Sequence, residues 1–501
     1  MPVQTLPFHS LIPIDRKAAT PIFQQLTNGL MQLIKAGTLQ PGVPLPSSRD
    51  MATLMKLNRT TVVAAYDELR IQGWIEAIAR KGFAISGKLP VLHPQSFHAH
   101  QHSPVKAADT PGFYKIISHE APVQMQRKVY DLVVGDGYPD ARIAPLQLLI
   151  NKYRALQNRH YKHMAVINEL PAGSALLRSE LATFLSQTRG LNIAADNILL
   201  SRGAQAAIYL AAQMIVKPGS RVIVGVLNYS KANKVFEQLG ATLVKVNMDE
   251  NGIDVDRIEE ICKTDPPNLL YIIPHHHHPT TVTLSPERRI KLLNIIRTYR
   301  LPVIEDDYDY DFHYENSPIL PLASADHDGL VLYIGSITKM LSLTIRCGFL
   351  VAGTDLIWQA GKLKELMELR SDLLMEDAIG YLFKTGEMQR HIARSVKLYK
   401  ARRDTFCNML ESRLSHILRF TNPPGGMAVW ALFNPEFSLP VISKALASQG
   451  IYLNDGSLYN QGNAAVNGVR LGFAAMNEEE MEIFVLKVAE CTSKISGAAN
   501  M

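Results

Sequence analysis

Cysteine is scarce in this sequence, and long apolar runs are absent from it. The four cysteines (Cys262, Cys347, Cys407 and Cys491) show no CxxC spacing, which indicates reduced thiols rather than a disulfide framework. No apolar run reaches the ~18 residues that a membrane-spanning helix needs, and the first residues lack the basic-then-apolar pattern of a secretion signal. We therefore expect a cytoplasmic protein with no membrane partner.

Acidic residues are few at the start of the chain. Residues 1–90 contain ten Lys or Arg and five Asp or Glu, so this part carries a charge of +5 out of a net +6 for all 501 residues. A chain of this length is expected to form two or three domains. The local excess of positive charge predicts that the first of them binds an anionic partner.

Residues 15–86 have the pattern of a winged helix-turn-helix domain. The stretch TPIFQQLTNGLMQLIKAG has apolar residues at helical spacing, and Gly37 can end that helix. SSRDMATLMKL begins with serines that can cap a second helix, and NRTTVVAAYDELRIQG predicts a third helix with an inner apolar stripe. WIEAIARKGFAIS alternates and turns at Arg80-Lys81-Gly82, as a two-stranded wing does.

A helix-turn-helix places the N-terminal end of its second helix in the major groove of DNA. Arg and Asn side chains read base edges there, while Ser and Thr hydroxyls bind phosphate. We therefore expect a double-stranded DNA operator as the partner. The residues predicted to contact it are Ser47, Ser48, Arg49, Asn58, Arg59, Thr60, Thr61, Arg80 and Lys81. The alternative is a small helical domain with a solvated basic surface.

The rest of the chain divides into a linker and a larger domain. Residues 87–127 are rich in Pro, His, Ser and Ala without periodicity, which is typical of a flexible linker. In residues 128–501, short apolar runs alternate with amphipathic stretches, which predicts an α/β domain with a mostly parallel sheet. We expect a large lobe at about 165–380 and a smaller α+β C-terminal lobe at about 381–495.

Polar side chains follow several of these predicted strands, at the sheet edge where such folds bind ligands. Pyridoxal phosphate needs a lysine for its aldehyde, a carboxylate at its pyridine nitrogen and a donor to its phenolic oxygen. Lys339, Asp306 and Tyr308 can supply these groups. The residues expected to cover its ring or bind its phosphate are Tyr229, Gly203, Ala204, Gln205, Ser336 and Arg346. Each residue alone has an ordinary structural explanation, and their order along the chain favours the cofactor.

The two parts together resemble the MocR/GabR-type regulators, a branch of the GntR regulators that carries a fold-type I aminotransferase-like domain. PIFQQLTNGLMQLIKAGTLQPGVPLPSSRD is similar to the GntR winged-helix pattern, and VIEDDYDYDFHY, YIGSITKMLSLTIRCGFL and GVRLGFA resemble the aminotransferase part. The resemblance implies that Lys339 is the cofactor lysine and that Asp306 and Tyr308 contact the ring. It also implies that Arg470 binds the carboxylate of a ligand and that the protein forms a head-to-tail homodimer.

Two stretches depart from the family pattern. PHHHHPTT places His278 where true aminotransferases have asparagine, and we expect His278 to reach the phenolic oxygen of the cofactor. INELPAG places Asn168 and Glu169 where a Tyr-Gly pair usually stands. The four adjacent histidines His275–His278 also suggest a metal site. Neighbouring residues of an extended chain point to opposite sides, however, and zinc ligands are usually spaced in pairs on turns, so we expect none.

Three functions remain open from the sequence. The first is a transcriptional regulator that senses a small amine or amino acid through an external aldimine at Lys339, which the basic unit favours. The second is a weakly active aminotransferase with a secondary DNA-binding domain, and the changes at Asn168 and His278 count against it. The third is a DNA-binding protein whose pocket has lost its cofactor, and the presence of Lys339 and Asp306 counts against that.

Overall fold

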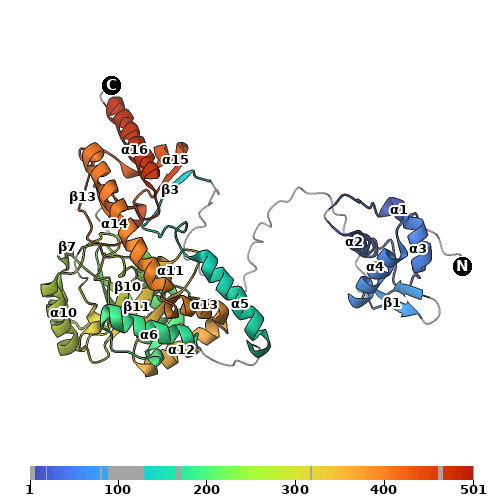
Figure 1. The fold of residues 1–501 in the computed structure, drawn as a ribbon, viewed down its shortest axis with the longest axis horizontal. Helices are drawn as coiled ribbons and strands as arrows, with labels where there is room; N and C mark the ends of the chain where they lie inside the picture. Colours follow the sequence, from blue (N-terminus) through green and yellow to red (C-terminus); the bar gives the residue numbers. More distant parts are fainter. Residues whose placement is uncertain are drawn as a thin grey trace. The chain divides into compact units, whose positions relative to one another are not determined.

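Two compact units, Met1–Gln124 and Met125–Met501, make up the chain. The computed structural model describes residues 6–18, 20–78, 82–88, 129–164, 171–315, 319–460 and 466–499 (Figure 1). Within these residues, no helix combines the length and the apolar character needed to cross a lipid bilayer.

The first unit is a helical domain with a two-stranded antiparallel sheet. The apolar stripes of its long helices meet in one core, where Leu26, Leu30, Val62, Tyr66 and Leu69 are at most 1% exposed. This packing confirms the predicted winged helix-turn-helix. Its elements are α1 (Phe8–Leu11), α2 (Ile22–Lys35), α3 (Ser48–Met55), α4 (Arg59–Ile71), β1 (Ile75–Ile78) and β2 (Gly82–Ile85).

Short polar side chains fix the starts of α3 and α4. The Ser47 hydroxyl accepts a hydrogen bond of 3.2 Å from the backbone N–H of Asp50, and the side-chain Oδ1 of Asn58 accepts one of 3.1 Å from the backbone N–H of Thr60. Such caps satisfy the free N–H groups of a first helical turn. The tip of the wing, with Arg80 and Lys81, lies outside the described residues.

The segment before α2 also belongs to this core. Phe8 and Ile12 are 3% and 2% exposed, and Ile12 lies against Gly29 of α2. A Cβ atom at position 29 would come within 2.3 Å of Ile12 Cγ2, so this close approach requires glycine. The sequence-based domain begins at residue 15, because the residues before it show no helical periodicity.

The second unit is built on a seven-stranded sheet with the strand order β4-β12-β11-β10-β9-β5-β6. Strand β12 runs antiparallel to both neighbours, and the other strands run in one direction. This sheet confirms the predicted α/β class. The strands are β4 (Ile198–Ser201), β5 (Arg221–Gly225), β6 (Thr242–Val246), β9 (Leu269–Ile272), β10 (Val303–Asp307), β11 (Val331–Ser336) and β12 (Gly348–Val351).

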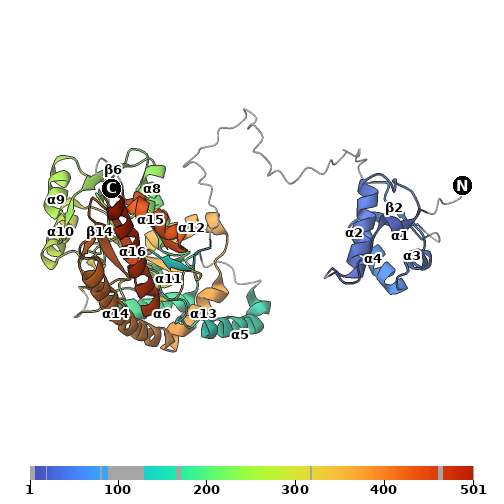
Figure 2. The same ribbon diagram turned by 90° about the horizontal axis from the view of Figure 1, so that it is seen from above.

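Helices cover both faces of this sheet. Val222 and Val224 of β5 pack on one face with α7 and α8, whereas Ile223 between them packs on the other face with α9 and α10. The first face is covered by α7 (Ala204–Ile215), α8 (Ser230–Gln238) and α12 (Thr354–Glu368). The second is covered by α6 (Ala175–Arg189), α9 (Val255–Thr264), α10 (Pro286–Tyr299) and α13 (Leu373–Lys384). Figure 2 shows α9 and α10 lying side by side.

A smaller lobe contains a three-stranded antiparallel sheet and three helices. Its elements are β13 (Leu418–Phe420), β14 (Ala428–Phe433), β16 (Gly468–Gly472), α14 (Glu387–Leu414), α15 (Leu439–Ser448) and α16 (Glu478–Ala499). Strand β15 (Ile451–Leu453) pairs in parallel with β3 (Leu132–Val134) and also contacts α15, which Figure 1 shows near β3. The start of the second unit thus packs with its C-terminal lobe.

The remaining elements are short or connect the two lobes. Helix α5 packs against α13, and β7 and β8 form a small antiparallel pair. These remaining elements are α5 (Leu146–Met164), α11 (Ile337–Met340), β7 (Met248–Asp249), β8 (Gly252–Ile253) and the 3₁₀ turns Ala195–Asn197, Leu322–Ser324 and Ser457–Tyr459.

We predict that Ile12→Ala destabilises the first unit by about 2–4 kcal/mol, because it removes a buried side chain from a tight contact. The neighbouring Leu11 is 41% exposed and provides the control, and Leu11→Ala should change stability by less than ~0.5 kcal/mol. Hydrogen exchange of the amides of α2 and α4 in the full-length protein measures the opening free energy. Equal effects of the two substitutions would show that this segment is not part of the core.

Candidate functional site

Parallel strands of the large sheet end at one edge, and the polar residues singled out in the sequence gather there. Asp306 lies near the end of β10, and Lys339 follows the neighbouring strand β11 on the short helix α11. Tyr308 lies beside Lys339, whose amine is 5.4 Å from the centre of the phenol ring. The structure therefore brings together residues from different strands, as expected for a ligand site in an α/β fold.

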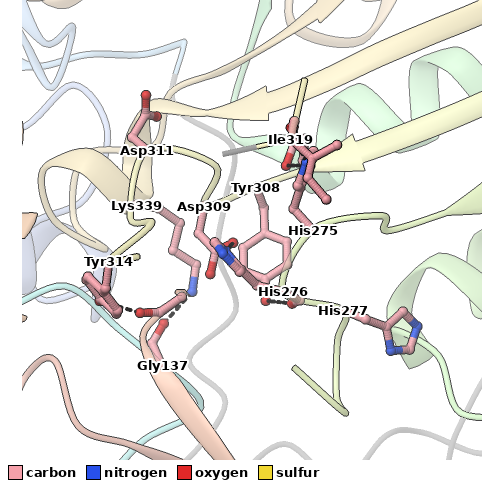
Figure 3. Close-up of polar contacts among 12 residues, drawn as sticks. Gly137, His275, His276, His277, Tyr308, Asp309, Asp311, Tyr314, Ile319 and Lys339 are labelled. Atoms are coloured by element: carbon pink, nitrogen blue, oxygen red, sulfur yellow. Dashed lines mark hydrogen bonds and ion pairs between the residues drawn. The ribbon is translucent and has the colours of Figure 1, made fainter. Parts of the chain in front are cut away.

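The amine of Lys339 lies in the interior of this site. Its Nζ donates a hydrogen bond of 2.6 Å to the carbonyl of Gly137, with Asp309 and Tyr308 beside it (Figure 3). Burial lowers the pKa of Lys339 to about 8, although nearby carboxylates, Asp136 first among them, oppose that shift. A lysine with a lowered pKa holds more of its amine in the neutral, nucleophilic form.

Asp306 is a buried carboxylate with one free oxygen. Its Oδ2 accepts a hydrogen bond of 2.7 Å from the hydroxyl of Tyr271, whereas Oδ1 has no hydrogen-bond partner among the described residues. Burial raises the pKa of Asp306 to about 7. Buried polar atoms almost always form hydrogen bonds, so we expect a bound ligand to donate one to this oxygen. The protonated pyridine nitrogen of pyridoxal phosphate fits this requirement.

The start of α7 offers a place for the phosphate. Gly203 precedes α7 with φ +84°, and a Cβ there would lie 2.6 Å from Nη2 of Arg346. Arg346 therefore lies against the first turn of a helix whose N–H groups are free to bind an anion. Gln205 in that turn has a buried side-chain oxygen with no partner in the described part of the chain. Two other residues are predicted to bind the phosphate: Ala204 is the first residue of α7, and Ser336 directly precedes α11.

Three predicted cofactor residues have partners within the protein. The hydroxyl of Tyr308 donates a hydrogen bond of 2.9 Å to the carbonyl of His276. Tyr229 precedes α8, and its ring lies edge-on to that of His278, with 5.2 Å between the ring centres. Nε2 of His278 lies 2.8 Å from Oδ2 of Asp136, an interaction that the sequence did not suggest.

The four adjacent histidines contact four different partners. His276 bonds to Asp309 and His278 to Asp136, while His275 contacts the carbonyl of Ile319 and His277 the hydroxyl of Thr280. Figure 3 shows His275, His276 and His277 pointing in different directions. Over the described ranges, no three His, Cys, Asp or Glu side chains are grouped as metal ligands.

Arg470 of β16 is almost fully buried and faces a carboxylate of the same chain. Its Nε lies 2.7 Å from Oδ1 of Asp136, and its Nη1 donates a hydrogen bond of 3.1 Å to the carbonyl of Pro279. Asp136 and Gly137 come from the segment after β3, which carries no motif in the sequence. Asn168 and Glu169 lie outside the described residues.

The predicted DNA-contacting residues lie around the start of α4. Arg49, Asn58, Arg59 and Thr60 are exposed, and Thr61 is half-buried. Nε of Arg59 donates a hydrogen bond of 3.4 Å to the hydroxyl of Ser48, which links the starts of α3 and α4. Ser47 and Asn58 also serve as helix caps, so part of this polar cluster has a structural role.

Two known families match the two parts of this chain. Residues 151–488, more than half of the chain, match the family described as aminotransferase class I and II. The chain belongs to this family. Residues 23–85 match the bacterial regulatory proteins of the gntR family. The aminotransferase domain of this chain is therefore preceded by a GntR-type helix-turn-helix, which is the MocR-type architecture.

Two curated relatives match nearly the whole length of this chain. The chain is 26% identical over 495 residues to the probable rhizopine catabolism regulatory protein MocR of Rhizobium meliloti, covering 97% of each protein. It is 26% identical over 482 residues to the pyridoxine biosynthesis transcriptional regulator PdxR of Corynebacterium glutamicum, covering 96% of this chain and 98% of the relative. These matches extend across both units of the chain.

Solved aminotransferase structures share the fold of the second unit. An archaeal alanine:glyoxylate aminotransferase superimposes with a TM-score of 0.67 and 27% identity, covering 73% of this chain and 91% of the other. The α-aminoadipate aminotransferase LysN of Thermus thermophilus gives a TM-score of 0.67 with 22% identity, covering 73% and 93%. The second unit therefore has the fold-type I aminotransferase fold, as predicted.

We predict that Asp306→Asn weakens the dependence of stability on pH. The pKa of Asp306 is raised to about 7 in the folded protein, compared with ~3.9 for an unfolded aspartate. The unfolded protein therefore releases this proton at a lower pH than the folded protein does. Stability is greatest below about pH 4, and the free energy of unfolding falls as the pH rises from about 4 to about 7, by about 1.4 kcal/mol per pKa unit. Asparagine cannot titrate, so the fall in unfolding free energy should be smaller in the variant.

Urea unfolding of the cofactor-free protein at several pH values between 4.5 and 7.5 measures this dependence. The exposed Asp355 at the start of α12 provides the matched control, and Asp355→Asn should retain the wild-type slope. An Asp306→Asn slope equal to that of the wild type would contradict the raised pKa.

Proposed function

We propose that this protein is a DNA-binding transcriptional regulator that holds pyridoxal phosphate and responds to a small amine or amino acid at that site. The observation that carries the proposal is the presence, in one chain, of a GntR-type domain and an aminotransferase domain that retains Lys339 and Asp306. The relatives named MocR and PdxR are regulators by name and match over both units, which supports this function over that of a simple aminotransferase.

Pyridoxal phosphate, when bound, supplies an aldehyde that can exchange one amine for another. The partly neutral amine of Lys339 would hold this aldehyde, and the free Oδ1 of Asp306 would accept a hydrogen bond from the protonated pyridine nitrogen. Arg346 and the first turn of α7 would bind the phosphate. Tyr308 lies beside Lys339, and the rings of Tyr229 and His278 contact each other.

Residues at the start of α4 would enter the major groove. Arg59 is exposed there and can reach base edges, while Thr60 and the N-terminal end of the helix can bind phosphate. Arg49, at the start of α3, would contact the DNA backbone. These contacts would supply an affinity for DNA that decreases with salt concentration.

The effector would change DNA binding because it binds two states of the regulator with different affinities. A head-to-tail homodimer is part of the proposal and rests on the resemblance to the MocR/GabR-type regulators. A cytoplasmic location is supported by the four cysteines, all of which are buried free thiols.

We predict that Lys339→Ala abolishes covalent capture of the cofactor and leaves DNA binding of the cofactor-free protein intact. Borohydride reduction followed by peptide mass mapping should place pyridoxyl phosphate on Lys339 in the wild type and on no lysine in this variant. The exposed Lys362 of α12 provides the matched control, and Lys362→Ala should retain capture at Lys339. Capture at another lysine in the wild type would overturn the assignment.

We predict that Arg59→Ala lowers DNA affinity by about 1–3 kcal/mol and relaxes sequence preference at one base position. Sequences selected from a random duplex library by the wild-type protein supply the operator for fluorescence anisotropy. Arg70 carries the same charge in the last turn of the same helix, and Arg70→Ala should have a much smaller effect. Equal losses of DNA affinity in both variants would show that the start of α4 does not lie in the major groove.

A further inference from the structure

The carboxylate of Asp136 pairs with Arg470, the residue to which the resemblance assigns the carboxylate of a ligand. Oδ1 of Asp136 lies 2.7 Å from Nε of Arg470, and Oδ2 lies 2.8 Å from Nε2 of His278. The Arg470 side chain is 1% exposed, whereas that of Asp136 is 37% exposed. Asp136 is therefore the more accessible member of this pair.

Other groups of this chain also contact Arg470. Its Nη1 donates to the carbonyl of Pro279, and its Nη2 lies 3.4 Å from the hydroxyl of Tyr308. Gly137 also packs closely, because a Cβ there would lie 3.2 Å from Nη2 of Arg470. The guanidinium is thus enclosed on several sides by groups of this chain.

The charges near the amine of Lys339 favour a cation over an anion. Asp136 and Asp309 lie close enough to raise the pKa of Lys339, and Arg470 close enough to lower it. Burial lowers the pKa of His277 to about 3, so its imidazole adds no positive charge near neutral pH, and burial also lowers the pKa of His278 against the opposing effect of Asp136. A ligand carboxylate would meet the like charge of Asp136, or would have to displace it from Arg470 and His278.

We infer that Asp136 is a specificity-determining residue that selects amines lacking a carboxylate on the amino-bearing carbon. Such an amine leaves the Asp136–Arg470 pair intact, whereas an α-amino acid must break it. This inference rests on the proposed function, because it names the class of effector for the same site. In the ligand-free protein, Arg470 then pairs with the protein's own carboxylate, that of Asp136.

Pairs of probes that differ by one carboxylate test the inference: n-propylamine against 2-aminobutyrate, and putrescine against ornithine. Titration of the cofactor-loaded protein, followed by its absorbance, gives an apparent Kd for each probe. In the wild type, each amine should bind at least tenfold more tightly than its amino acid. Asp136→Asn should reduce this ratio at least tenfold, because a neutral amide no longer repels the carboxylate or neutralises Arg470.

Asp131→Asn provides the matched control, since Asp131 is an exposed carboxylate five residues earlier in the same segment, and it should keep the wild-type ratio. A second readout needs no cofactor: propanoate should raise the Tm of cofactor-free Asp136→Asn and leave that of the wild type unchanged. If Asp136→Asn does not fold, Asp136→Ser replaces it.

Wild-type preference for the amino acids, or an unchanged ratio in Asp136→Asn, would overturn the inference. A propanoate shift in the wild type as large as in the variant would overturn it as well. If no probe changes the absorbance of any variant while propanoate discriminates between wild type and Asp136→Asn, the role of Asp136 at Arg470 stands. In that case it is amine sensing, and with it the proposed function, that fails.

Discussion

Burial of the seven-stranded sheet on both faces is the constraint on which the site depends. Because α7, α8 and α12 cover one face and α6, α9, α10 and α13 the other, polar side chains of the strands find room at their ends. The shared direction of β10 and β11 then places Asp306 beside Ile334 and brings Lys339 to the same edge. The positions of the lysine and the carboxylate therefore follow from the packing of the apolar residues around the strand ends.

The acidic run in and after β10 shows how neighbouring carboxylates acquire different roles. His275 and Arg189 lower the pKa of Asp307, against the effect of burial, and His276 bonds to Asp309. Asp306 has the neutral hydroxyl of Tyr271 as its hydrogen-bond partner, and its pKa is raised. The histidines therefore contact Asp307 and Asp309 and leave Asp306 available to a ligand.

Residues with local sequence signals could be predicted, and those held by distant contacts could not. The stripe of α4, the strand ends and the residues Lys339 and Asp306 follow from periodicity, motif order and resemblance. The packing of Ile12 on Gly29 depends on a shape match without periodicity. Asp136 reaches Arg470 and His278 because β3 pairs with β15, more than 300 residues later in the chain, and no spacing rule reports such a pairing.

The pairing of β3 with β15 also sets an order of assembly during synthesis. The core of the first unit is complete within the first 88 residues, from Phe8 to Ile85. Strand β3 cannot reach β15, nor Asp136 reach Arg470, until residues beyond 450 have left the ribosome. At about 5–20 residues per second, synthesis of the chain between these two points takes on the order of 20–80 s. Each nascent chain therefore carries a foldable DNA-binding unit well before its ligand pocket can close.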